Sequence, residues 1–239
     1  GNIGKLVAYY AYKLGFEIFV NDPPLMDIGY NFPNYVTYFK IESIFQNCQI
    51  ITNHVPLTIS GKYPTINLID RNLLKFIRNN SLFIHTSRGK IVNQMDLIEE
   101  LKKKKLFLAI DVWDNEPYFD LELVNLAMFA TPHVAGYSYD GKIKASKQVL
   151  QHFENHFGIN VDFSMLNNEL AKSSRISINE INNISQLCNL LENARKFNED
   201  NIDYTKFADY EQDRIKSYFI EFRAQYPNRN EVLMPPNES

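Results

Sequence analysis

The chain has 239 residues, which is long enough for one or two hydrophobic cores. Its net charge is −3 at pH 7, so it lacks the excess of basic residues that is typical of nucleic-acid-binding proteins. No apolar run is long enough to span a membrane. Its two cysteines, Cys48 and Cys188, are far apart and lack metal-ligand spacing. We therefore expect reduced thiols, a cytoplasmic location, and no metal site.

The first residues, Gly1-Asn2-Ile3-Gly4, precede an apolar helical pattern that Gly15 ends. A strand-like segment, Phe16–Val20, then leads to Asp22. This order matches the second half of the dinucleotide fingerprint G-x-G-x-x-G, whose acidic residue accepts hydrogen bonds from a ribose hydroxyl. The pattern predicts a nucleotide-binding domain that starts inside its phosphate loop and lacks the first strand of its sheet.

Helical and strand-like segments alternate as far as residue 132, which predicts an α/β fold with a doubly wound, parallel, Rossmann-like sheet. In the usual strand order, a missing first strand would leave a gap beside the strand at 16–20, with a spacing of about 10 Å instead of roughly 4.8 Å. Asp70 and Asn93 are expected to cap helices. The expected strands are Phe16–Val20, Gln49–Asn53, Ser81–Thr86, Phe107–Val112 and Met128–Thr131.

The composition changes after Gly158, where the chain becomes rich in Asn and Glu. We expect an incomplete nucleotide-binding domain at 1–138, then a helix at 139–158 that Asp140 caps and that returns toward a missing substrate domain. A small, mainly helical module is expected at 159–239. Apolar residues recur at helical spacing in Ile178–Leu191 and Ile215–Phe222, and they would be buried either against each other or against a second copy of the chain.

Polar motifs follow three successive predicted strands. They are Thr86-Ser87-Arg88-Gly89, Asp111-Val112-Trp113-Asp114-Asn115-Glu116-Pro117 and Thr131-Pro132-His133-Val134-Ala135-Gly136-Tyr137. Singly, each has an ordinary explanation: a surface ion pair for Arg88, a turn carboxylate for Glu116, and a structural hydrogen bond for His133. Strand ends of an open α/β sheet lie at one edge, however, where ligands bind.

Together these motifs would supply the three groups that oxidation of a secondary alcohol requires. A histidine titrates near neutral pH and can take the alcohol proton. A carboxylate on its other ring nitrogen fixes the tautomer and stabilises the imidazolium. A guanidinium can hold a substrate carboxylate in bidentate fashion. The sequence therefore predicts hydride transfer at this edge.

The order of these motifs resembles that of the D-isomer-specific 2-hydroxyacid dehydrogenases over residues 1 to about 155. The resemblance implies NAD as cofactor, His133 as proton acceptor and donor, Glu116 as its partner, and Arg88 as the substrate clamp. It also implies that Tyr137 contacts the substrate, although an aromatic residue there would also suit simple packing. The cofactor contacts that it implies are Asn2, Ile3, Asp22, Val55, Thr86, Ser87, Arg88, Asp111 and Gly136.

Three further stretches are most similar to a branch of this family that oxidises a phosphorylated 2-hydroxy acid and dimerises through a C-terminal domain. They are Gly61–Thr65, His133–Ser138 with Gly141-Lys142, and Phe222-Arg223 with Tyr226–Glu231. The resemblance implies a homodimer that acts on a small phosphorylated substrate. Two alternatives remain: a dehydrogenase for another 2-hydroxy acid, such as phosphoglycerate, and an NAD-sensing module without turnover.

Overall fold

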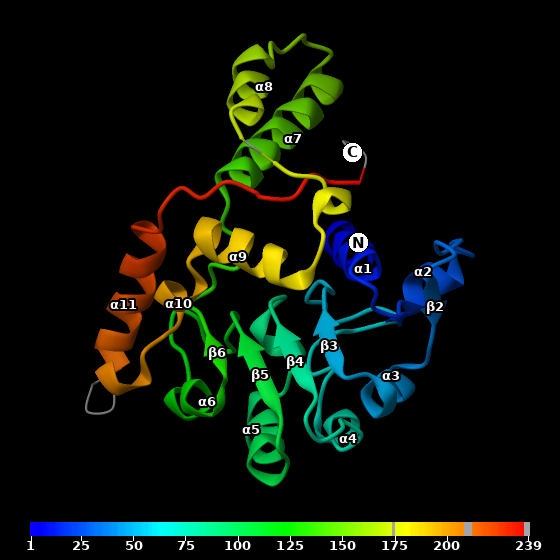
Figure 1. The fold of residues 1–239 in the computed structure, drawn as a ribbon, viewed down its shortest axis with the longest axis vertical. Helices are drawn as coiled ribbons and strands as arrows, with labels where there is room; N and C mark the ends of the chain where they lie inside the picture. The colour runs from blue at the N-terminus through cyan, green and yellow to red at the C-terminus, as the bar shows by residue number, and fades with distance from the viewer. Residues whose placement is uncertain (174, 208–211, 237–239) are drawn as a thin grey trace. The chain divides into compact units, whose positions relative to one another are not determined.

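The computed structural model describes residues 1–173, 175–207 and 212–236. Its strands form two sheets, and within each sheet the neighbouring strands run parallel (Figure 1). One sheet pairs β1 with β2, and the other has the order β3-β4-β5-β6. The predicted break is present, because no ladder joins β1 to β3 among the described residues. The strands are β1 (Ile18–Val20), β2 (Val36–Tyr38), β3 (Ile50–Asn53), β4 (Leu82–His85), β5 (Phe107–Ile110) and β6 (Phe129–Ala130).

Five of these strands lie inside predicted segments, and each is shorter than expected. The strand β2 was not anticipated, because Val36–Tyr38 is only three residues long and lies among aromatic residues and prolines. It pairs in parallel with β1, with Ile18 opposite Val36 and Val20 opposite Tyr38. Strand length depends on how far a neighbouring strand extends, which the sequence pattern does not specify.

The chain divides into two compact units, the first made of residues 1–135 and 200–225. Within it, Asp70 and Asn93 accept hydrogen bonds from backbone amides at the starts of α4 and α5, as predicted. Its helices are α1 (Asn2–Lys13), α2 (Pro23–Asp27), α3 (Ile41–Asn47), α4 (Arg71–Leu74), α5 (Gln94–Lys103), α6 (Leu121–Leu126) and α11 (Gln212–Ala224), with 3-10 turns η1 (Gly89–Ile91) and η3 (Tyr204–Lys206).

The core of the first unit includes residues from the C-terminal quarter of the chain. Ile215 and Phe219 of α11 are buried in the same cluster as Phe83 and Leu108 of the sheet. The ring of Phe119 meets that of Phe207 edge-on, with centroids 5.4 Å apart. Residues 200–225 therefore group with the nucleotide-binding domain, whereas the sequence suggested a separate C-terminal module. Hydrophobic contact between segments distant in sequence decided this.

The second unit comprises residues 136–199 and the chain from Tyr226 onward. Its elements are α7 (Tyr139–Phe157), α8 (Ser164–Ala171), η2 (Ile178–Glu180), α9 (Ile184–Arg195) and the start of α10 (Phe197–Asp200). Gly158 ends α7 in a left-handed conformation, at φ 62°. The predicted cap, Asp140, is wrong: Ser138 caps the helix by accepting a hydrogen bond from the Gly141 amide at 2.9 Å.

Asp140 is instead fully buried in the first turn of α7. Its carboxylate accepts a hydrogen bond from the Ser173 hydroxyl and one from the Glu231 amide, the latter at 2.7 Å. Glu231 also forms an ion pair with Lys144 at 2.5 Å. The start of α7 and the segment after Tyr226, two of the stretches that carry the narrower resemblance, therefore lie side by side.

Among the described residues, no helix combines the length and apolar character that crossing a membrane requires. Both cysteines are free thiols: Cys48 is half-buried and Cys188 is exposed.

Candidate active site

The three polar motifs follow β4, β5 and β6, which are neighbours in one parallel sheet (Figure 1). The register places Ile84 of β4 opposite Ala109 of β5, and Ala109 opposite Phe129 of β6. Because all three strands run in the same direction, Arg88, Glu116 and His133 leave the same edge of the sheet.

Glu116 and His133 form a hydrogen-bonded pair. The Nδ1 atom of His133 lies 2.7 Å from Oε2 of Glu116, and their side chains remain 27% and 26% exposed. Since the carboxylate occupies Nδ1, the neutral ring carries its proton there and presents Nε2 as an acceptor. Within the described residues, Nε2 has no hydrogen-bond partner. The pair is therefore arranged to take a proton at Nε2.

The environment of Glu116 keeps its carboxyl ionised. Burial alone raises the pKa of Glu116. Hydrogen bonds from His133 and from the Trp113 amide, the latter at 3.1 Å, lower the pKa, and so do the electrostatic interactions with His133 and Arg223. Their combined effect exceeds that of burial, so the pKa of Glu116 lies below its ordinary value. A carboxylate that stays charged at neutral pH can stabilise a protonated imidazole.

Asp111 holds the loop that carries His133. This carboxylate is 3% exposed, and its Oδ1 accepts hydrogen bonds from the Thr131 hydroxyl at 2.6 Å and from the amides of Val134 and Ala135 at 2.7 and 3.1 Å. Burial raises the pKa of Asp111, and these hydrogen bonds partly oppose that rise. The predicted cofactor contact of Asp111 stays a prediction, whereas its anchoring contacts are direct.

Gly89 brings the Arg88 loop against the loop that carries Glu116. A Cβ atom at Gly89 would lie 2.0 Å from the carbonyl oxygen of Trp113 and 2.6 Å from the amide of Asp114. Only glycine permits this approach. Arg88 itself is exposed, and its guanidinium donates a hydrogen bond to the Ser87 carbonyl at 2.6 Å. The backbone next to Arg88 is thus held against the loop that carries Glu116.

A polar network joins the ends of β3 and β4, and the sequence patterns did not predict it. Asn53 and His85 are paired in the ladder, and the Asn53 amide lies 3.0 Å from Nδ1 of His85. Ser87 donates to the Asn53 side chain, and Nε2 of His85 lies 3.4 Å from the Gly89 carbonyl. Two polar residues ending adjacent apolar strands were the signal that could have revealed it.

The start of α1 suits a dinucleotide phosphate. Asn2 and Ile3 are exposed in its first turn, which holds no acidic residue and no side-chain cap. Helix N-terminal amides favour an anion at such a position. Asp22 follows β1, and its Oδ1 accepts a hydrogen bond from the Leu25 amide at 3.1 Å as the cap of α2. One carboxylate oxygen remains able to accept from ribose.

The remaining predicted contacts differ in their surroundings. Val55 is half-buried and packs against the core of the first unit, whereas Ser87 is buried in the network described above. Thr86 is half-buried. In the second unit, Gly136 is exposed, and the ring of Tyr137 packs edge-on against Tyr226 at 5.5 Å. The substrate contact predicted for Tyr137 stays a prediction.

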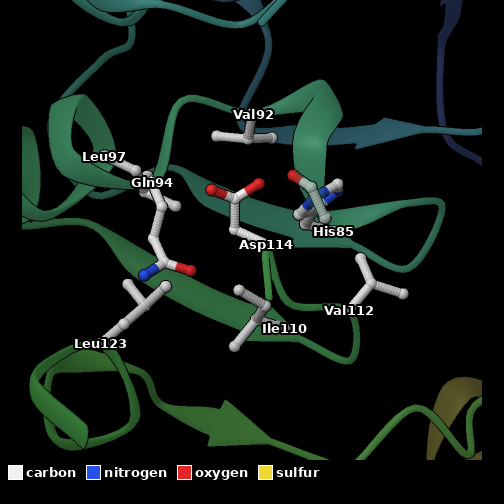
Figure 2. Close-up of a pocket in the computed structure, with 9 residues that line it drawn as sticks. His85, Val92, Gln94, Leu97, Ile110, Val112, Asp114 and Leu123 are labelled. Atoms are coloured by element: carbon white, nitrogen blue, oxygen red, sulfur yellow. The ribbon is translucent and has the colours of Figure 1, made fainter. Parts of the chain in front are cut away.

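A cavity between β4, β5 and the start of α5 is too small for a cofactor. Figure 2 shows the Asp114 carboxylate pointing into it, with His85 and Gln94 on opposite sides. Its volume of about 10 Å³ has room for about one water molecule. Within the part of the chain that the structure describes, no three His, Cys, Asp or Glu side chains are placed to share a metal ion.

Comparison with known families identifies this domain. Residues 1–135 match the sequence profile of the NAD-binding domain of D-isomer specific 2-hydroxyacid dehydrogenases. The chain belongs to this family. The matched range is the same as the N-terminal segment of the first compact unit. The α/β fold and NAD as cofactor, both predicted from the sequence, are thereby confirmed.

Curated relatives include two enzymes named erythronate-4-phosphate dehydrogenase. The one from Bacteroides fragilis is 38% identical over 164 residues, which are 68% of this chain and 46% of that protein. The one from Pseudomonas putida is 28% identical over 240 aligned positions, covering 97% of this chain and 60% of that protein. The chain spans about half the length of these relatives.

A solved structure with the same fold is an NAD-dependent formate dehydrogenase from Staphylococcus aureus in complex with NAD. It is 28% identical, has a TM-score of 0.51, and aligns with 65% of this chain and 46% of its own. The chain is thus similar to dehydrogenases in both sequence and fold.

Proposed function

We propose that the protein oxidises 4-phospho-D-erythronate to 2-oxo-3-hydroxy-4-phosphobutanoate with NAD, a step of pyridoxal 5′-phosphate biosynthesis. The observation that carries the proposal is the Glu116–His133 pair, whose 2.7 Å contact leaves Nε2 of the imidazole available. The curated relatives named erythronate-4-phosphate dehydrogenase support the choice of substrate. Other 2-hydroxy acids, including phosphoglycerate, are the competing substrates.

Each residue of the site then has a defined task. Nε2 of His133 accepts the proton of the substrate C2 hydroxyl during oxidation and returns it during reduction. Glu116 stabilises the imidazolium that forms and keeps Nδ1 protonated. Arg88 binds the substrate carboxylate and polarises the carbonyl group that forms at C2. These roles match the groups that the three loops carry: an imidazole, a carboxylate and a guanidinium.

Bound NAD would supply the acceptor for the hydride that leaves C2 of the substrate. The amides at Asn2 and Ile3 would hold its pyrophosphate, and Asp22 would accept hydrogen bonds from the adenosine ribose. A carboxylate repels the 2′-phosphate of NADP, and the neighbours Pro23 and Pro24 add no compensating charge. We therefore expect the protein to prefer NAD. We also propose a cytoplasmic location, where both thiols would stay reduced.

The decisive experiment replaces the proposed base in the full-length protein. We expect His133→Asn to lower kcat by about 10²–10⁴-fold, the usual loss for a general base, with 4-phospho-D-erythronate as substrate. Asparagine is the appropriate replacement because, like histidine, it tolerates the left-handed backbone found at this position, φ 57°. NADH fluorescence measures cofactor binding separately, and the Kd for NADH should be unchanged.

Three results would count against the proposal. Turnover by His133→Asn at the wild-type rate would remove His133 from its role. Faster oxidation of 3-phosphoglycerate than of 4-phospho-D-erythronate would assign another substrate. NADH binding with no turnover of any 2-hydroxy acid would favour the sensing module. Glu116→Gln is the second variant: without the carboxylate, the imidazolium loses its partner, so kcat should fall while NADH binding persists.

A further inference from the structure

Asn53, His85 and Ser87 form a hydrogen-bonded network beside the candidate substrate clamp, Arg88. His85 is 1% exposed and ends β4, three residues before Arg88. One ring nitrogen faces the Asn53 amide at 3.0 Å, and the other faces the Gly89 carbonyl at 3.4 Å. Asn53 in turn accepts a hydrogen bond from the Ser87 hydroxyl. The residues on both sides of Arg88 are thereby tied to one imidazole.

The donors and acceptors allow one consistent arrangement. The Gly89 carbonyl can only accept, so Nε2 of His85 carries the proton and donates to it. Nδ1 is then an acceptor and takes a hydrogen bond from the Asn53 amide. The Asn53 carbonyl oxygen remains to accept from Ser87. Every side-chain polar atom in this chain of contacts is satisfied, and such networks hold one geometry in a buried site.

The same segment is restrained from the other side. Gly89 touches the backbone of Trp113 and Asp114 so closely that no side chain fits there. The guanidinium of Arg88 is bound to the Ser87 carbonyl at 2.6 Å. The backbone at Arg88 therefore has little freedom, although its side chain is exposed. A bidentate grip on a planar carboxylate requires such a fixed origin.

We propose that His85 and Asn53 are positioning residues that orient Arg88 toward the substrate carboxylate through Ser87 and Gly89. The inference rests on the proposed function, because it assumes that Arg88 binds this carboxylate. It predicts that loss of the network weakens binding of carboxylate ligands much more than binding of NADH. A misplacement of the order of 1 Å near a reacting group can lower rates about 10²-fold, so the effect should be measurable.

The test measures a binding constant rather than turnover. Oxamate, an unreactive carboxylate analogue of a 2-oxo acid, is titrated into the NADH complex of the full-length protein, and NADH fluorescence reports its Kd. We expect His85→Leu and Asn53→Leu each to raise this Kd by about 10–100-fold. His85→Gln should restore most of the affinity, because one amide can donate to Gly89 and accept from Asn53.

A double-mutant cycle separates positioning from a general structural role. Arg88→Ala alone should abolish most of the oxamate affinity, and His85→Leu should add nothing in that background, since it acts through Arg88. His152→Leu, at an exposed position on α7, is the matched control. Thermal unfolding and NADH Kd are recorded for every variant, and Asn53→Leu serves if His85→Leu does not fold.

The possible failures are distinguishable. If Arg88→Ala binds oxamate as tightly as wild type, the clamp in the proposed function is wrong. If Arg88→Ala weakens oxamate but His85→Leu and Asn53→Leu do not, the positioning inference is overturned and the function stands. Equal losses from His85→Leu with and without Arg88 would show that the network affects ligand binding independently of Arg88, which would also overturn the positioning inference.

Discussion

His133 has a backbone conformation that few residues adopt. Its φ of 57° lies in the left-handed region, which costs a non-glycine residue about 1–3 kcal/mol. The next two amides, of Val134 and Ala135, are both fixed by Asp111. The buried carboxylate therefore imposes the turn, and the turn determines where the imidazole meets Glu116.

His85 should make stability depend on pH. Burial lowers its pKa to about 4, although the hydrogen bond to the Gly89 carbonyl opposes this. Below its ordinary pKa of about 6.5, the unfolded chain binds a proton that the folded chain refuses until pH falls to about 4. We expect the free energy of unfolding to fall by the order of 3 kcal/mol over this window. Urea unfolding at several pH values measures it.

The variant His85→Gln removes the titrating group but keeps the hydrogen bonds, so its stability should vary less between pH 6.5 and pH 4. The control His152→Gln alters an exposed imidazole and should retain the wild-type dependence. Identical pH profiles for His85→Gln and wild type would mean that another group, such as His54, whose pKa burial also lowers, causes the loss.

At the scale of elements, the contact between the loops after β4 and β5 depends on one glycine. In Gly89→Ala, the added methyl would meet the Trp113 carbonyl at 2.0 Å, so the two loops must separate. Overpacking of this kind typically costs about 1–3 kcal/mol. We expect that loss in urea unfolding, together with a shifted emission of Trp113, the single tryptophan of the chain, which is 3% exposed.

The matched control is Gly136→Ala. A methyl group added at Gly136 would have no described atom beyond its chain neighbours within 4 Å, and the backbone there has no positive φ, so the replacement should change the unfolding free energy little. If Gly89→Ala were as stable as Gly136→Ala and left the Trp113 emission unchanged, the two loops would not be held by this contact.

At the scale of the whole molecule, the apolar surface available for a homodimer differs from the predicted one. Ile215 and Phe219 are 5% and 1% exposed within the first unit, so this stripe does not need a second copy. On α7, by contrast, Val149, Phe153 and Phe157 are 68%, 46% and 60% exposed. These residues share one helix and form an apolar surface on the second unit.

We expect the full-length protein to be a dimer by light scattering at micromolar concentration, with α7 at its interface. Replacing both aromatic rings, Phe153→Glu with Phe157→Glu, should give a monomer, because charges buried without partners are costly. Ile220→Glu alters an equally exposed apolar residue, 50% exposed on α11, and should leave the dimer intact. A wild-type monomer would reject the dimer, and a dimer that survives the double replacement would place the interface elsewhere.

Several features followed from the sequence because they depend on residues close together in the chain. The helix that begins after Gly1, the caps at Asp70 and Asn93 and the helix end at Gly158 are local, and each is present as predicted. The strand-end motifs also predicted that His133 and Glu116 would meet, since parallel strands place their carboxyl ends together.

Only the tertiary structure decided the contacts between distant segments. Helix α11 packs in the core of the first unit. Asn53 pairs with His85, and Asp140 accepts hydrogen bonds from Ser173 and Glu231. All of these contacts join residues far apart in sequence. Such contacts depend on which surfaces meet after the chain has folded. Local patterns carry the preferences of a segment, whereas burial and hydrogen bonding between segments select its partner.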